Sequence, residues 1–385
     1  MNTNSINIHL SHYLPTQHMD PARVQTTYEK VVAHRTRPPF AYCAEEDGVI
    51  ESIDAEAHVA KVKYKSGKVV AVSYGDDYTN NGGGGFWATQ NIVLNNLNVG
   101  SKVKRGDVII YNEKFFTPDP YSNQVTWNLG SEAHIALLEA NHTLDDGNII
   151  TKTLAEKLRF NPVHIRDIVI KKDTTIHKYA AVGTSVLNTD PLMIFDQSAM
   201  TDDMFGKLEG EAVDLLAKLN RQTPKAKFTG KIVRIEAYFK CPISEMAPGL
   251  KGIVLQIAKE KLAKSKAAAG SSNAEDYNPD IQVKYTDRIG TTDLDNDTVI
   301  LRYFIQQDMG MDMGSKIEFH SSLKSVTALI LPNDIEVEDH SIKVHGCYSQ
   351  IGVCNRIINS PTICGIAGRV IEQVEQQILD YYFNN

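Results

Sequence analysis

The sequence predicts a mixed fold that is mainly β with a few helices, and three observations support this class. Short runs in which apolar and polar residues alternate recur along the 385-residue chain. Most of these runs end at Gly, Asn or Asp, residue types that favour turns between strands. Helical periodicity, with apolar residues three or four positions apart, is restricted to fewer segments. A chain of this length forms two or three compact units, or one large interleaved unit.

Six strands are predicted from the alternating runs, because a period of two places one set of side chains against the core. They cover residues 48–53, 58–64, 68–74, 163–170, 230–239 and 298–305. Residues 82–85 are all glycine and follow two asparagines, a pattern that predicts a β-hairpin tip. A phosphate-cradling loop is the alternative, but no strand-to-helix frame surrounds these glycines.

Helical periodicity predicts helices over residues 130–139, 151–158, 202–219, 252–269 and 365–383. The last has the clearest apolar stripe, formed by Ile366, Val370, Val374, Ile378 and Leu379. We expect this amphipathic helix to pack against the body of the protein or against a partner. Residues 265–279 are small and polar, which is typical of a loop or linker.

The charge balance excludes one class of nucleic-acid-binding protein. The chain has 40 Lys and Arg against 47 Asp and Glu, a formal net charge of −7. A histone-like protein that binds phosphates through its overall field is basic. Any phosphate-binding role of this chain therefore depends on a few basic residues gathered locally.

Cysteine usage and the absence of long apolar runs predict a cytoplasmic protein without a membrane partner. The five cysteines are odd in number and include no CxxC pair, which favours free thiols in a reducing compartment. No apolar run approaches the roughly 18 residues of a membrane helix. The first ten residues have neither the basic nor the apolar region of a secretory signal.

No complete catalytic motif occurs, but three groups of residues could serve chemistry. The chain contains no GxSxG, HExxH or Walker A sequence. Asp145 and Asp146 are a turn or helix cap by their local sequence, and they are also the carboxylate pair that a divalent cation requires. Lys316 and Lys324, eight positions apart, are surface lysines or two ammonium groups that hold phosphate in one cavity. Arg23 and Arg356 are either ordinary surface arginines or residues whose guanidinium groups donate paired hydrogen bonds to phosphate oxygens.

Several segments, taken in chain order, carry a family resemblance. They are HMDPARV with Asp20 and Arg23, ATQNIVLNN, GSKVKRGDVI, the LDDGNIIT segment with Asp145 and Asp146, VGTSVLNTDPLMIF, GSKIEFHSSLKS with Lys316 and Lys324, ILPNDIEVEDHSIKV, and GVCNRI with Arg356. In this order and spacing they resemble the C-terminal half of the β subunit of multisubunit DNA-directed RNA polymerases. The resemblance spans nearly the whole chain and rests on the collinear set rather than on any one motif.

The resemblance implies a fold and a domain organisation. The family's core is a β-barrel of the double-psi type, interrupted by a flap-like β domain, so that the barrel is discontinuous in sequence. Applied to this chain, the barrel's first parts and the nucleotide-contacting segment cover 1–228. A shortened flap with its linker covers 229–297, the second barrel part covers 298–364, and the amphipathic helix covers 365–385.

The resemblance also implies residue roles. Lys316 and Lys324 are the catalytic positions that contact the RNA 3′ end and the nucleotide phosphates. Arg23 and Arg356 bind the triphosphate, and Asp20 lies beside Arg23 at the nucleotide site. Asp145 and Asp146 match the family's Glu-Asp pair, which helps to order a nucleotide-bound Mg²⁺. The catalytic Mg²⁺ belongs to a β′-like partner, because no DFDGD-like run occurs here, so this chain is expected to be inactive alone.

The resemblance departs from cellular β subunits in length, since those chains are more than twice as long. Subunits divided into separate chains resemble the RNA polymerases of giant tailed bacteriophages. The expected partners are β N-terminal-like and β′-like chains, template DNA, product RNA, nucleoside triphosphates and an initiation factor at the flap, in the cytoplasm of a host cell or packaged in a virion.

The alternative is a structural or virion β-domain protein, whose basic residues would be scattered instead of facing one cavity. A biotinyl-type carrier is disfavoured because no lysine sits in an MKM-like hairpin.

Overall fold

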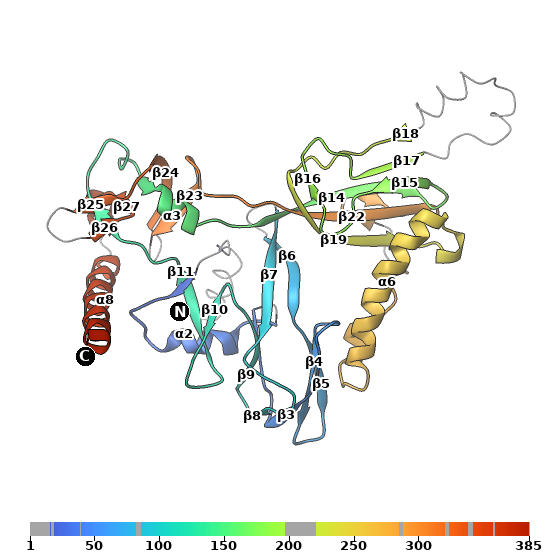
Figure 1. The fold of residues 1–385 in the computed structure, drawn as a ribbon, viewed down its shortest axis with the longest axis horizontal. Helices are drawn as coiled ribbons and strands as arrows, with labels where there is room; N and C mark the ends of the chain where they lie inside the picture. The colour runs from blue at the N-terminus through green and yellow to red at the C-terminus, as the bar shows by residue number, and fades with distance from the viewer. Residues whose placement is uncertain are drawn as a thin grey trace. The chain divides into compact units, whose positions relative to one another are not determined.

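A computed structural model describes residues 16, 19–38, 40–81, 86–196, 221–284, 288–319, 323–337, 342–356 and 359–384. It confirms a mainly β fold with few helices. The chain divides into two compact units, each assembled from separate stretches of sequence (Figure 1). Unit 1 comprises Met1–Cys43, Tyr111–Asn161 and Met309–Asn385, and unit 2 comprises Ala44–Ile110 and Pro162–Asp308. The domain boundaries at 228, 297 and 364 stay predictions.

The main sheet of unit 2 is centred on a mostly apolar strand. In β22 (Thr298–Gln306) nearly every residue is buried, and the strand pairs antiparallel with β14 (Pro162–Lys171) on one side and β19 (Gly230–Phe239) on the other. β14 also pairs with β7 (Phe86–Leu94), β7 with β6 (Gly75–Asn81), and β19 with β16 (Ser185–Val186). A strand flanked on both sides and buried on both faces carries a continuous apolar run, which accounts for the sequence TVILRYFI.

Helix α6 (Pro248–Ala268) covers part of this sheet. It begins four residues before the predicted start, at Pro248. Proline is tolerated in the first turn because N–H groups there have no partner within the helix. Leu250, Ile253 and Val254 are buried in the same core as Leu301. The predicted linker 265–279 is wrong in part: its first residues end α6, and η3 (Ala274–Tyr277) follows. Asn273 pairs its side-chain amide with the backbone of Ala71, which fixes this segment on the neighbouring sheet.

The remaining elements of unit 2 are small antiparallel sheets. The largest has the order β5-β4-β3-β8, and its first three strands were all predicted from alternation. The elements are β3 (Gly48–Asp54), β4 (Val59–Tyr64), β5 (Val69–Ser73), β8 (Lys102–Val103), β15 (Thr175–Tyr179), β17 (Met193–Asp196), β18 (Arg221–Gln222), η2 (Ile243–Glu245), β20 (Arg288–Ile289) and β21 (Thr292–Asp293). The buried strand β9 (Val108–Asn112) ends in unit 1.

Unit 1 is built around a five-stranded sheet of order β12-β27-β13-β24-β23. Its strands are β12 (Ile135–Leu137), β27 (Gly346–Tyr348), β13 (Gly147–Thr151), β24 (Leu323–Leu331) and β23 (Lys316–Phe319). β12 runs parallel to β27 and β13 parallel to β24, whereas the other two pairs are antiparallel. Strands from the middle of the chain therefore alternate with strands from its last quarter.

The other elements of unit 1 include a second, three-stranded sheet in which β11 pairs with β1 and β10. Helix α3 starts at a Thr151 side chain that accepts from the Leu154 amide, a standard N-cap. The elements are β1 (Asp20–Pro21), α2 (Tyr28–Val31), η1 (Val32–Arg35), β2 (Ala41–Cys43), β10 (Phe116–Pro118), β11 (Val125–Gly130), α3 (Lys152–Lys157), β25 (Ile335–Val337), β26 (Ile342–Val344), α7 (Gln350–Asn355) and α8 (Ser360–Asn384).

All six predicted strands are confirmed, as are the helices predicted over 151–158, 252–269 and 365–383. The helix predicted over 130–139 is wrong, because residues 135–137 pair as strand β12 with β27. Tertiary strand pairing outweighs local periodicity in so short a segment. The helix predicted over 202–219 and the glycine tip at 82–85 lie outside the described residues.

None of the sheets formed by the described strands closes on itself. Of the helices that the structure describes, none has both the length and the apolarity needed to cross a bilayer. Cys43, Cys241, Cys347, Cys354 and Cys364 are free thiols.

Candidate functional site

The two candidate lysines lie on one exposed face of the β23–β24 pair in unit 1. In the antiparallel register Lys316 is opposite Val326, and Glu318 is opposite Lys324. Opposite residues share a face, so the lysines are diagonal neighbours, about 7–8 Å apart at the backbone. Both are exposed, and neither ammonium group has a hydrogen-bond or ion-pair partner among the described residues. The strand pair thus presents two positive charges to solvent.

The Asp145–Asp146 turn is anchored beside these lysines. Both aspartates have left-handed backbone angles, φ 49° and 65°, which Asp tolerates better than most residues. The backbone carbonyl of Asp146 accepts from the Val326 amide (3.0 Å) and from the Ser325 hydroxyl (2.7 Å). Since Ser325 and Val326 directly follow Lys324, the turn lies at the start of β24. Asp145 and Asp146 form a turn, as the local sequence predicted. They do not cap α3, because Thr151 is its N-cap residue.

Arg356 joins the same group through an ion pair with Asp146. Its guanidinium Nη2 donates to Oδ1 of Asp146, and the two side chains are 31% and 54% exposed. Arg356 is at the end of α7, whose first turn is held by Ser349 and Glu139. The Glu139 carboxylate accepts from the Ser349 hydroxyl and the Ile351 amide, both at 2.8 Å. These two hydrogen bonds lower the pKa of Glu139, and the bond from the Ile351 amide has the larger effect.

Tyr348 is a neighbour of this pair that the sequence did not single out. It lies on β27 and is 1% exposed, and its hydroxyl lies near the Asp146 carboxylate but makes no well-formed hydrogen bond in the part of the chain that the structure describes. Burial raises the pKa of Tyr348, and the nearby Asp146 carboxylate adds to this while Arg356 opposes it. The phenol therefore stays neutral beside a charged pair.

Three further buried polar residues lie on the face of the sheet that carries Tyr348, opposite the face with the two lysines. The Asn148 amide donates to the Ser325 hydroxyl at 2.7 Å, and both residues are almost fully buried. Asn148 Oδ1 and Thr327 Oγ1 have no hydrogen-bond partner among the described residues. Buried polar atoms without partners are rare and mark places where a structure is specialised. In the sequence, these residues could have been recognised only as polar residues at alternate strand positions whose side chains point into the core.

Asp20 and Arg23 lie elsewhere in unit 1. The Asp20 carboxylate pairs with Lys157 Nζ at 3.0 Å and accepts from the Glu132 amide at 3.1 Å. The Arg23 guanidinium pairs with the carboxylates of Glu132 and Glu375. The hydrogen bond to Glu132 raises the pKa of Arg23 above its usual value. Both candidate residues are thus engaged in local ion pairs.

The strand register separates these two groups. Glu132, the partner of Arg23, precedes β12, which starts beside Gly346 at the beginning of β27. Asp146, the partner of Arg356, precedes β13, which starts beside Tyr348 at the end of β27. β12 and β13 run in opposite directions on either side of β27, so their starts lie at opposite ends of the sheet. The structure places the Asp145–Asp146 turn and its partner Arg356 at the start of β24, the strand that carries Lys324. Arg356 ends α7, whose Val353 packs with Leu323 and Tyr348, so it approaches the sheet from the face opposite the two lysines. Asp20 and Arg23 are not brought to either group.

The carboxylates of this group do not form a complete metal site. Mg²⁺ binds an octahedron of oxygen ligands. Asp145 and Asp146 offer two carboxylates, one of them paired with Arg356. Within the described ranges, no three His, Cys, Asp or Glu side chains gather as metal ligands. These two carboxylates alone therefore do not complete such an octahedron.

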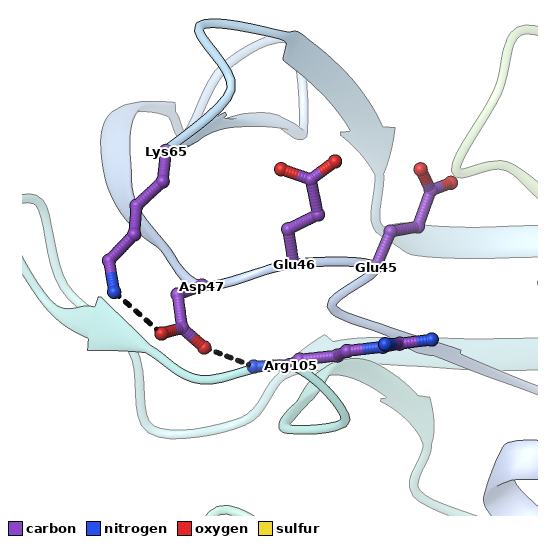
Figure 2. A pocket seen from close by; sticks show the side chains of 5 residues that line it. All are labelled: Glu45, Glu46, Asp47, Lys65 and Arg105. Atoms are coloured by element: carbon purple, nitrogen blue, oxygen red, sulfur yellow. Dashed lines mark hydrogen bonds and ion pairs between the residues drawn. The ribbon is translucent and has the colours of Figure 1, made fainter.

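A pocket of about 430 Å³ lies in unit 2, apart from the candidate residues of unit 1. Figure 2 shows its lining: Glu45, Glu46, Asp47, Lys65 and Arg105. The Asp47 carboxylate accepts from Lys65 Nζ (2.7 Å) and from the Arg105 backbone amide (3.0 Å). Its lining has three carboxylates and two basic groups, and Asp47 is already paired with Lys65, so the pocket offers no cluster of positive charge for a phosphate.

No protein-family model matches this chain, and no curated protein matches it significantly. Function is therefore argued from the residues of unit 1 themselves.

Proposed function

We propose that this chain is a β-C-terminal-type subunit of a multisubunit DNA-dependent RNA polymerase, supplying residues that bind the nucleoside triphosphate and the RNA 3′ end. One observation supports the proposal most strongly. The Asp145–Asp146 turn and its ion-pair partner Arg356 lie at the start of β24, the strand that carries Lys324, although Asp146 and Ser325 are 179 positions apart in sequence. Lys316 is the diagonal neighbour of Lys324 on the adjacent strand β23.

This charge arrangement suits phosphoryl transfer. The transferred phosphoryl group and the leaving pyrophosphate carry negative charge, and catalysis depends on positioning and stabilising it. A lysine ammonium close to a phosphate contributes about 1–4 kcal/mol near a protein surface. Lys316 and Lys324 act as two such point charges, and the Arg356 fork can bind two oxygens of one phosphate. The net charge of the chain does not matter at this range.

Arg356 and Asp146 neutralise each other in the absence of nucleotide. When a triphosphate binds the guanidinium, the Asp146 carboxylate is released next to Asp145. Mg²⁺, when bound by the nucleotide and the partner chain, neutralises phosphate charge. Asp145 and Asp146 would help to order that ion from this chain, and the chain alone would be inactive.

The proposal includes a fold and partners. Interleaving of 135–151 with 316–348, in both parallel and antiparallel pairs, supports a double-psi-like barrel core. Residues 229–297, with α6, are its shortened flap. The proposed partners are β N-terminal-like and β′-like chains, DNA, RNA, nucleotides and an initiation factor, and the proposed compartment is the cytoplasm. Asp20 and Arg23 stay predictions of the resemblance.

The test is primer extension by the assembled enzyme, purified through a tag on this chain. Lys324→Ala should lower the rate of nucleotide addition by about 100-fold or more, since removing one charge-stabilising donor has that effect. Lys343→Ala is the matched control, because Lys343 is also an exposed lysine on a strand of unit 1. That variant should keep the rate of the unaltered enzyme, and both variants should assemble with their partners.

A structural β-domain protein is the second candidate function, favoured by one observation. Arg23 is bound by two carboxylates at the far end of the sheet, as expected of a surface ion pair in a protein without a nucleotide site. The same experiment separates the two functions. An assembly without polymerase activity, or full extension by the Lys324→Ala enzyme, would favour the structural role.

A further inference from the structure

Helix α8 turns its apolar side away from its own unit. None of its residues is buried, and Ile363, Ile366, Val370, Val374 and Ile378 are between 47% and 63% exposed. Figure 1 shows α8 as a single long helix at the C-terminal end of the chain. So large an exposed apolar surface on one element is unusual for a chain that remains alone in water.

The contacts of α8 with unit 1 are made by its polar side. Glu372 lies 3.0 Å from His134 Nε2, and Glu375 pairs with Arg23. At 100° per residue, Glu372 projects roughly 160° away from Val374. The helix is therefore held by ion pairs on one side and presents its apolar stripe on the other. A helix oriented to bury its apolar side in its own unit would have the reverse arrangement.

The outward-facing apolar residues are symmetric along the helix. Leu379, which the sequence assigned to the stripe, projects within about 20° of Glu372 and so is not one of them. Ile363 and Tyr381 are each nine residues from Glu372, Ile366 and Ile378 are each six, and Val370 and Val374 are each two. When two copies pack antiparallel about a twofold axis at this midpoint, Val370 meets Val374 of the other copy and Ile366 meets Ile378. A twofold interface requires such self-complementarity.

Charge and area are both compatible with self-association. The stripe residues are uncharged, and Gln373 and Gln377 at its border are neutral, so pairing brings no like charges together. A helix of 25 residues is about 37 Å long, and half of its lateral surface is about 600 Å². Two copies then bury about 1,200 Å², which exceeds the roughly 1,000 Å² expected of a specific interface.

We propose that α8 is a homodimerisation helix, whose apolar stripe packs antiparallel against α8 of a second copy of this chain. This inference does not depend on the proposed polymerase function, because it uses only α8 and its contacts.

Sedimentation velocity of the full chain over a concentration series tests it. The unaltered chain should form dimers in the micromolar range, and Val370→Glu with Val374→Glu should weaken dimerisation about 100-fold or more, because two carboxylates enter an apolar contact. Gln376→Lys adds a charge on the polar side and should leave dimerisation unchanged. Since no α8 residue is buried, circular dichroism should show the same fold for all three.

Three results would overturn the proposal: a monomer at every concentration, a dimer that persists in the double Glu variant, or equal loss of dimer in Gln376→Lys. Capture of the stripe by a different subunit, with this chain monomeric in the complex, also excludes the second copy. Orientation is tested by cysteine cross-linking after replacing Cys354 and Cys364 with Ser. Ile366→Cys mixed with Ile378→Cys should cross-link, whereas Ile366→Cys alone cross-links only in a parallel pair.

Discussion

At the scale of single residues, the Arg356–Asp146 pair and the buried Tyr348 hydroxyl define the candidate site. The pair is partly exposed, so solvent screens it and its contribution to stability is small. Its importance is therefore positional: it holds the forked Arg356 donor at the start of β24, the strand that carries Lys324. Tyr348 supports the pair from the buried side of the sheet.

Replacing Tyr348 with Phe should leave the free energy of unfolding of unit 1 unchanged or raise it by up to about 1 kcal/mol. The hydroxyl is buried and makes no well-formed hydrogen bond among the described residues, so removing it ends a desolvation cost. Tyr348→Ala, which empties the site, should lower the same quantity by about 3–5 kcal/mol. Urea denaturation measures both. A loss of more than about 1 kcal/mol in the Phe variant would show that the hydroxyl is bonded in the folded protein.

At the scale of elements, β12, β13 and β27 decide which candidate residues meet. β27 pairs with both other strands, and their opposite directions separate Arg23 from Arg356. His345, which precedes β27, fixes this arrangement: its Nδ1 accepts from the His134 backbone amide at 3.1 Å. Burial lowers the pKa of His345, since desolvation disfavours its charged form.

Unit 1 should therefore lose stability as the pH falls below 6.5, the usual pKa of the imidazole. In that range the unfolded chain takes up the proton before folded His345 does, and the loss continues until the pH reaches the lowered folded pKa. Protonation at Nδ1 also removes the bond from His134. His345→Asn should flatten this dependence, measured as urea midpoints at a series of pH values. An equally steep dependence in that variant would assign it to other groups, such as His134, Glu372 or Asp334.

The sequence predicted the elements whose pattern is local. β19 was placed at its observed limits, and α8 within a few residues, because alternation and helical periodicity are visible in consecutive residues. β12 was missed because three residues hold no period, and its partner strand is more than 200 positions away. The burial of Asn148 and Tyr348 was missed for the same reason. Arg23 was expected beside Arg356, but its partner Glu375 is 352 positions distant and no local pattern announces it.

At the scale of the whole molecule, the chain consists of two compact units. Each contains one tryptophan, Trp87 in unit 2 and Trp127 in unit 1. Trp87 contacts Phe304 of the central strand β22, with ring centroids 5.6 Å apart. Each tryptophan therefore reports on the unfolding of its own unit.

Leu301→Ala should destabilise unit 2 by about 2–5 kcal/mol, because Leu301 is fully buried between β14 and β19. In a Trp127→Phe background, Trp87 fluorescence should show the lower denaturant midpoint. As a control, Leu255→Ala removes a leucine that is 48% exposed and should shift the midpoint little. Equal effects of the two changes would contradict the assignment of the core.

The central claim concerns lysines at an RNA 3′ end, and chemical labelling tests it most directly. In the assembled enzyme, an RNA whose 3′-terminal ribose is oxidised to a dialdehyde forms an imine with a nearby lysine amine and releases water. Borohydride then reduces the imine to a stable amine that mass spectrometry locates. We predict the label on Lys316 or Lys324, competed by unmodified RNA primer. Labelling confined to lysines outside the β23–β24 pair would contradict the account.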